Sequence, residues 1–250
     1  MSVLIVPKDK QAFGQFNGGA ILENKPIGFS HEGGELHAYS NLFYWAHAWS
    51  DEGSTIGLHP HKGFEIMSFV LKGQIEHYDT KLREWKLLSA GDAQIIRSGS
   101  GISHAEKLLA GSHIFQIWTD PDLSKTFRKE ASYDDYENGS FPRTEEGGLT
   151  RKVVIGEGSP LTLDTANLQI EEYQLIAGSH NLSITDGQVA SIYVIEGTLS
   201  HDGKEIVQDD FIKVEDENSL ELEVSEDATL FAIFSPKRPA YRTYREMQFA

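Results

Sequence analysis

Two pairs of candidate metal ligands constrain this chain more than any other feature of its sequence. His59 and His61 are separated by one residue, and so are His104 and Glu106 further along. Residues two apart point to the same side of a β-strand, so each pair is aligned when its segment is extended. If the two strands are neighbours, three imidazoles and one carboxylate converge. The spacing therefore predicts a β-fold built around a metal site.

The first half of the chain reads as many short strands joined by glycine-rich turns. Aromatic and β-branched residues, which favour a pleated surface, dominate the apolar segments. Short strands at hairpin spacing are typical of an antiparallel barrel or sandwich, so we expect an all-β fold. One short helix is expected around residues 123–131. The expected strands are 42–49, 65–71, 74–79, 85–88, 93–96 and 113–118.

The sequence of the second half of the chain is similar to that of the first half. The segment 69–75 (FVLKGQI) resembles 193–199 (YVIEGTL), which indicates duplication of a whole β-domain rather than a short repeat. The proline-containing, charge-rich stretch 120–148 holds the expected connection. We therefore expect tandem domains, residues 1–135 and 136–250.

The second copy lacks the candidate ligands. Counting back from Gly197 by the offsets of the first half places Ser183 and Thr185 where the first domain has its two histidines. His180 and His201 stand alone, and we interpret them as surface or turn residues. Only the first domain is expected to bind metal.

Charge and composition exclude several functions. The formal charge is -16, with 38 acidic and 22 basic side chains, which disfavours nucleic acid and anionic membranes as direct partners. Without cysteine there can be no disulfide and no thiolate-bound metal. The apolar start is too short for a secretory signal, and no apolar run predicts a membrane span. We expect a cytoplasmic protein. Its basic, aromatic tail, 235–250, is expected to pack back across the acidic body through its aromatic side chains, and a partner-binding patch is the alternative interpretation.

Imidazole and carboxylate ligands suit Fe(II), Mn, Co, Ni, Cu or Zn. A second carboxylate, Glu65, either replaces Glu106 as a ligand or orients a histidine, and we favour the latter because Glu106 shares a strand face with His104. Extending the alternation from His61 places Glu65 on the metal side of its strand. The same alternation places Met67 and Phe69 there, and His77 and Gln116 are further candidates for the pocket wall.

The motifs around these residues resemble those of the cupins and, within them, the pirin family. Residues 59–65 read HPHKGFE where pirins have HPHRGFE, and Gly73 and the segment EHYD at 76–79 follow. Residues 91–94 (GDAQ) and 98–106 (SGSGISHAE) resemble the second pirin motif. The resemblance is specific over residues 40–120 and only architectural in the C-terminal half.

The resemblance implies a bicupin, with two antiparallel jelly-roll β-barrels in tandem and metal, usually iron, in the first. The pirin ligand positions correspond to His59, His61, His104 and Glu106. The implied activity is that of quercetin 2,3-dioxygenase, an oxidoreductase that opens the heterocycle of a flavonol with dioxygen and releases carbon monoxide. In this reading Glu106 also accepts the proton of the substrate hydroxyl.

Two alternatives are compatible with the same residues. Some pirins are regulators that bind a protein partner, and there the oxidation state of the iron acts as a switch. A metal-dependent isomerase on a cupin fold needs a separate acid–base pair, for which the sequence offers no assignment.

Overall fold

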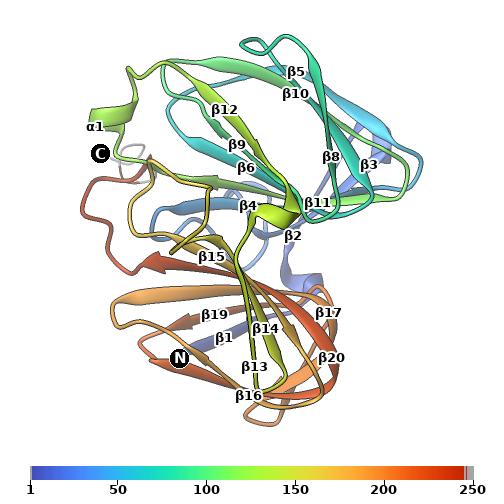
Figure 1. Ribbon diagram of the computed structural model, residues 1–250, viewed down its shortest axis with the longest axis vertical. Coiled ribbons are helices and arrows are strands. Elements are labelled where there is room, and N and C mark those ends of the chain that lie inside the picture. Colours follow the sequence, from blue (N-terminus) through green and yellow to red (C-terminus); the bar gives the residue numbers. More distant parts are fainter. Residues whose placement is uncertain (1, 245, 247–250) are drawn as a thin grey trace. The chain divides into compact units, whose positions relative to one another are not determined.

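Antiparallel strands form most of the described chain, residues 2–244 and 246 of a computed structural model (Figure 1). They fall into two units, each closed around its own apolar interior. The N-terminal barrel comprises 11–139, 163–166 and the described residues of 240–250. The C-terminal barrel comprises the described residues of 1–10, with 140–162 and 167–239. The expected all-β fold with two antiparallel barrels is confirmed.

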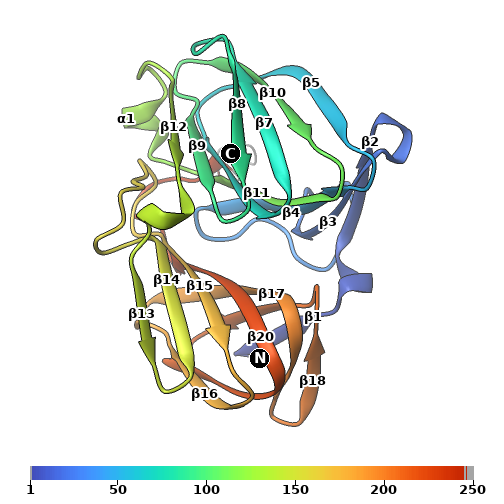
Figure 2. The same ribbon diagram turned by 45° about the vertical axis from the view of Figure 1, so that its right-hand side comes forward.

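The N-terminal barrel has a seven-stranded sheet in the order β12-β9-β6-β11-β4-β3-β2 and a four-stranded sheet in the order β5-β10-β7-β8 (Figure 2). The strands are β2 Ala12–Phe16, β3 Ile21–Ile27, β4 Leu42–Ser50, β5 Ser54–His61, β6 Glu65–Lys72, β7 Gln74–Asp79, β8 Trp85–Ser89, β9 Ala93–Arg97, β10 Ile102–Leu108, β11 Ser112–Thr119 and β12 Ser132–Tyr136. Short helical turns are η2 Asn17–Gly19, α1 Leu123–Thr126 and η3 Asn138–Ser140.

The C-terminal barrel has the sheet order β1-β19-β17-β20-β15-β14-β13, with β16 paired to β20 and β18 paired to β17. Its strands are β1 Val3–Val6, β13 Arg143–Glu146, β14 Leu149–Ile155, β15 Gln169–Leu175, β16 Gly178–Ser183, β17 Gln188–His201, β18 Lys204–Val207, β19 Phe211–Glu215 and β20 Ser219–Pro236, and η1 is Lys8–Lys10. Aliphatic residues that alternate along β17, β19 and β20 fill its core.

Three local expectations turn out differently. The expected helix forms but ends at Thr126, where Asp122 caps its start through the backbone N–H of Ser124. Strand β1 pairs with β19, which places the start of the chain in the C-terminal barrel rather than the first domain. Described residues beyond Pro239 belong to the N-terminal barrel.

No helix of the described chain is long and apolar enough to span a membrane.

Gly197 allows β17 to bend between two register shifts in its pairing with β20. Its φ is +95°, and a Cβ there would lie 2.5 Å from the carbonyl oxygen of Asp227 and 2.7 Å from Cα of Ala228. Both neighbours are backbone atoms and cannot rotate away. We expect Gly197→Ala to lower the free energy of unfolding by about 3 kcal/mol, measured by urea denaturation.

Gly203 is the matched control, because its φ is +74° but nothing lies within 4 Å of its hypothetical Cβ. Gly203→Ala is expected to cost about 1 kcal/mol from the positive φ alone. Equal losses in both variants would show that the close approach at Gly197 is unimportant.

The tail contacts the N-terminal barrel at Asp120. Tyr241 donates its hydroxyl to the Asp120 carbonyl at 2.5 Å, and the backbone N–H of Tyr244 donates to the Asp120 carboxylate at 3.0 Å. The Tyr244 ring lies 5.8 Å from that of Phe43. The expectation that the tail packs through its aromatic side chains is met by these two tyrosines, whereas residues 245 and 247–250 lie outside the described residues.

Burial, aided by the charge of Glu246, raises the pKa of Asp120 to about 7, although the Tyr244 N–H lowers it in part. The folded protein therefore keeps this proton at pH values where the unfolded chain has lost it, so this residue's contribution to stability falls as pH rises from about 4 to about 7. We expect Asp120→Asn to be more stable than the parent at about pH 8, by on the order of 2 kcal/mol, and similar to it at about pH 4. Denaturation curves at the two pH values test this, and an identical pH dependence in both proteins would contradict it.

Candidate metal centre and aromatic pocket

Strand pairing brings the two ligand pairs together in the N-terminal barrel. In the β10–β5 ladder His104 lies opposite His59, and in the β10–β7 ladder Glu106 lies opposite His77. Each pair shares one strand face, as the alternation predicts. Strand β10, between β5 and β7, is therefore the element that assembles the site.

Three imidazoles converge at this point. The ligand-capable atoms of His59, His61 and His104 all lie within 4.8 Å of one another. The Nε2 atoms of His59 and His104 are 3.0 Å apart, and His59 donates Nδ1–H to the carbonyl of Gly57 at 2.8 Å. That bond leaves the Nε2 lone pair of His59 directed at the cluster.

The nitrogen atoms in this cluster fit a metal. Nitrogen ligands at about 2.1 Å from a metal, in adjacent octahedral positions, lie about 3 Å apart. Nε2 of His61 is buried without a hydrogen-bond partner. A buried polar atom without a partner is costly, and a metal ion would satisfy it.

The imidazoles are held in the neutral form that binds metal. Burial, together with the neighbouring histidines, lowers the pKa of His61 to about 3 and that of His104 to about 2. Protonating either ring would place an uncompensated charge beside two other imidazoles. No proton therefore competes for the ligand lone pairs at neutral pH.

Glu106 is fully buried and receives only neutral donors. Ser68 donates its hydroxyl at 2.7 Å, Gln94 donates an amide N–H at 3.4 Å, and the Gln116 side-chain amide also donates to it. No lysine or arginine of the described chain forms an ion pair with this carboxylate. A buried carboxylate without a cation is costly, which is consistent with a metal ion beside it.

The structure also groups Glu106 with His77 and His104. Both ring nitrogens of His77 are already engaged, because Nε2 faces the Asp79 carboxylate at 3.1 Å and Nδ1 faces the Gln94 amide at 3.3 Å. The ring also stacks on Tyr133, with 4.4 Å between centroids. His77 lies beside the cluster, with 5.5 Å between its ring centroid and that of His104, and the Gln116 amide contacts Glu106.

Glu65, Met67 and Phe69 do not face the metal cluster, so the expected alternation is wrong from β6 onward. Strand β5 ends at His61, and the break at Gly63, whose φ is +94°, shifts the alternation by one residue. Ser68 therefore points to Glu106, and its strand neighbours point to the opposite face.

Glu65 has a structural role on that opposite face. Its carboxylate accepts the backbone N–H groups of Asp164 and Thr165 at 2.8 Å each, and the Thr165 hydroxyl at 2.5 Å. This carboxylate anchors the segment 163–166 rather than a metal or a ligand histidine.

Sequence reasoning missed Ser68, Gln94 and Asp79. Gln94 lies in the GDAQ motif, which was the available signal, and Asp79 lies in the EHYD segment. Asp79 accepts the backbone N–H groups of Lys81 and Leu82 at 2.7 Å each, which fixes its orientation toward His77. Nothing in the local pattern distinguishes Ser68 from any other strand serine.

An aromatic pocket of about 440 Å³ lies next to the cluster. Phe64 and Trp118 line it, and each ring lies 5.3 Å from the ring of His61. The indole N–H of Trp118 is buried without a partner. The pocket thus offers flat aromatic walls close to the imidazoles. Other lining residues are Phe29, His31, His37, Phe43 and Tyr244.

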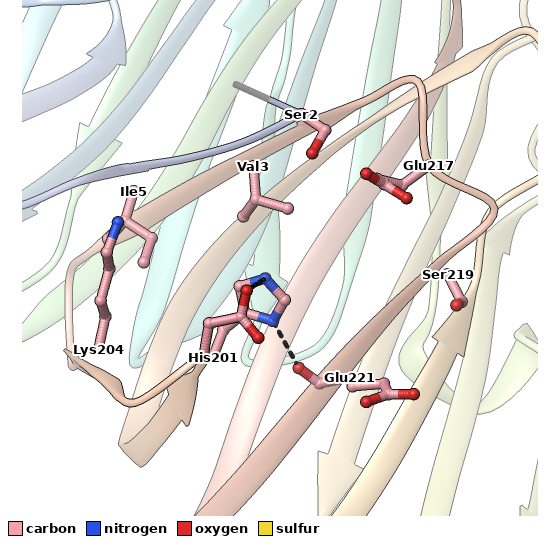
Figure 3. Close-up of a pocket in the computed structure, with 9 residues that line it drawn as sticks. Ser2, Val3, Ile5, His201, Lys204, Glu217, Ser219 and Glu221 are labelled. Carbon is pink, nitrogen blue, oxygen red and sulfur yellow. Dashed lines mark hydrogen bonds and ion pairs between the residues drawn. The ribbon is translucent and has the colours of Figure 1, made fainter.

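The histidines of the C-terminal barrel form no comparable cluster among the described residues. His201 lies in a groove of about 520 Å³ and donates Nδ1–H to the Glu221 carbonyl at 2.8 Å (Figure 3). His180 contacts the Ile176 carbonyl at 2.8 Å. Both engage backbone carbonyls, in agreement with their interpretation as surface residues.

Comparison with known proteins also relates the chain to pirins and quercetin 2,3-dioxygenases. The family model described as Pirin matches residues 30–119. Quercetin 2,3-dioxygenase of Escherichia coli K12 is 24% identical over 200 residues, covering 74% of this chain and 78% of that protein. Pirin-1 of Arabidopsis thaliana is 32% identical over 146 residues, covering 56% of this chain and 50% of that protein.

The fold of the chain is also similar to that of a solved pirin structure. The crystal structure of a bacterial pirin from Escherichia coli in complex with nickel(II) superposes with a TM-score of 0.78 at 20% identity, covering 94% of this chain and 99% of that one. The likeness includes the C-terminal barrel, which the family model does not reach. In its motifs, its relatives and its fold, the chain is similar to the pirin family of bicupins.

Proposed function

We propose that this protein is a metal-dependent dioxygenase that cleaves flavonols in the manner of quercetin 2,3-dioxygenase. The observation that carries the proposal is the position of the three-imidazole cluster, which shares Phe64 and Trp118 with an aromatic pocket. A flat, polyphenolic substrate matches such walls. The name of the Escherichia coli relative supports the same reaction class.

The proposed metal is Fe(II), held by His59, His61, His104 and Glu106. Nitrogen and oxygen ligands without sulfur also accommodate nickel, the metal in the bacterial pirin structure. When bound, the ion supplies Lewis-acid polarisation of substrate oxygens and redox capacity toward dioxygen.

The protein's own residues bind and orient the substrate. Phe64 and Trp118 hold its ring system. Glu106 accepts the substrate hydroxyl proton, with Ser68 and Gln116 fixing the direction of the carboxylate. Burial of this carboxylate keeps bulk water from competing for the proton.

The test is anaerobic reconstitution with Fe(II), metal quantification, and then mixing with quercetin and dioxygen while carbon monoxide is measured. We expect about one ion per chain and carbon monoxide release that depends on it. Release from metal-free protein would contradict the mechanism. One bound ion without turnover would contradict the enzyme and favour the regulatory alternative, for which partner capture by ferrous and ferric protein is the next measurement.

A further inference from the structure

The C-terminal barrel contains a cavity of about 470 Å³ that the proposed metal chemistry does not use. Arg151 on β14 and Glu171 and Tyr173 on β15 form its charged wall. Asn181 and Ser183 on β16, with Gln188 at the start of β17, add amide and hydroxyl groups. This volume lies in the range of small-molecule sites.

The charged wall is an ordered cluster. Nε of Arg151 donates to the Glu171 carboxylate at 2.7 Å, and Nη2 donates to its other oxygen. The Tyr173 hydroxyl donates to the same carboxylate. The Glu171 side chain is only 5% exposed, whereas that of Arg151 is 42% exposed. The carboxylate is therefore covered, and the guanidinium is the charge that the cavity presents.

The N-terminal barrel has a similar cluster at the corresponding place. Its sheet order β6-β11-β4-β3 parallels β17-β20-β15-β14 of the other barrel. On β3 and β4, Lys25 lies 3.2 Å from the Glu23 carboxylate, and Tyr44 donates to it at 3.4 Å. Tyr44 stacks on Trp118 of the aromatic pocket, with 4.5 Å between centroids. In the N-terminal barrel these three side chains are buried, whereas in the C-terminal barrel the cation, the carboxylate and the tyrosine line a cavity.

Stability alone does not account for such a cluster. An ion pair with one buried partner recovers little more than its desolvation cost, and apolar replacements are often as stable. Arg151 has five N–H donors and directs two of them at Glu171. The guanidinium also contacts the Tyr173 hydroxyl, and because the Arg151 side chain is 42% exposed, its other N–H groups are open to a planar anion.

We propose that this cavity binds a small hydroxylated carboxylic acid, with the carboxylate on Arg151 and the hydroxyl groups on the amide and hydroxyl side chains around the rim. Side-chain amides both donate and accept, so they suit hydroxyl groups better than a second charge. Leu182 and Phe234 supply an apolar wall for the carbon chain. The site is separate from the metal centre and does not depend on the proposed dioxygenase activity.

The test is calorimetric titration of the full-length protein with D-gluconate and with D-glucose, which has similar hydroxyl groups but no carboxylate. We expect saturable binding of gluconate and at least about tenfold weaker binding of glucose, because the charge-assisted pair is lost. Equal affinities, or no binding of gluconate at millimolar concentration, would overturn the proposal.

Two variants locate the site. The double variant Arg151→Met/Glu171→Gln avoids an unpaired buried carboxylate and should weaken gluconate binding at least about tenfold. Asn181→Leu, at the exposed rim, should weaken it about fivefold without affecting folding. Unchanged affinity in both variants would overturn the proposal.

Two controls exclude other locations. Lys204→Ala removes the lysine of the neighbouring groove (Figure 3), and His59→Ala removes a proposed metal ligand. Both should bind gluconate as the parent does. Loss of binding in Lys204→Ala would assign the anion to the groove, and loss in His59→Ala would assign it to the metal centre, so either result would overturn the proposal.

Discussion

Replacing His104 with alanine is expected to weaken the binding of Fe(II) or Ni(II) at least about 100-fold, because it removes a ligand and not merely a supporting residue. His104 is the residue shared by the two groups of candidate ligands, and its Nε2 lies 3.0 Å from that of His59. Without it, His59 and His61 remain on β5, and Glu106 is the one proposed ligand left on β10. Metal content after dialysis, followed by titration with the metal, measures the effect.

The matched control is His180→Ala, which removes an imidazole from the C-terminal barrel, where it contacts a backbone carbonyl. Its metal content should equal that of the parent. Circular dichroism shows whether His104→Ala keeps its β-structure, so that lost binding is not lost folding. Parent-like metal affinity in a folded His104→Ala protein would refute this assignment of the metal centre.

Glu106→Gln is expected to lower the rate of carbon monoxide release per bound metal by at least about 100-fold, since a neutral amide cannot accept the substrate proton. The amide is nearly isosteric with the carboxylate. It nevertheless places an N–H group among the donors from Ser68, Gln94 and Gln116. Three imidazoles remain, so metal binding should weaken much less than in His104→Ala.

Glu65→Gln is the control that separates the two carboxylates. Glu65 binds the backbone of Asp164 and Thr165, so its replacement should lower the free energy of unfolding and leave turnover per bound metal close to that of the parent. Turnover that falls in Glu65→Gln and persists in Glu106→Gln would reverse the roles that the structure indicates.

Local sequence predicted the parts of the site that lie within one strand. The spacing of His59 and His61, and of His104 and Glu106, aligned each pair because side chains alternate along an extended chain. The strand segments at 65–71, 74–79 and 113–118 appear as β6, β7 and β11. Alternation extended across a turn failed, because the loop before Glu65 changed the face on which the following residues lie.

Partners from distant strands could not be predicted in this way. The link from Ser68 to Glu106 joins β6 to β10, and the anchoring of residues 163–166 by Glu65 spans about a hundred residues of chain. Strand β1, near the start of the chain, pairs with β19, which lies near the other end of the sequence. Such contacts arise from sheet register, which no short window of sequence contains.

The sequence by itself determined the all-β class, the duplication, the family motifs and the choice of candidate ligands. Each of these depends only on residue type and on short-range spacing along the chain. Tertiary structure alone decided what Glu65 binds, how His77 is held, and that Phe64 and Trp118 form a pocket wall. It also revealed the Arg151–Glu171 cluster in the C-terminal barrel. The physical reason is that strand alternation is a local property, whereas register and closure of a barrel are set by the packing of the whole sheet.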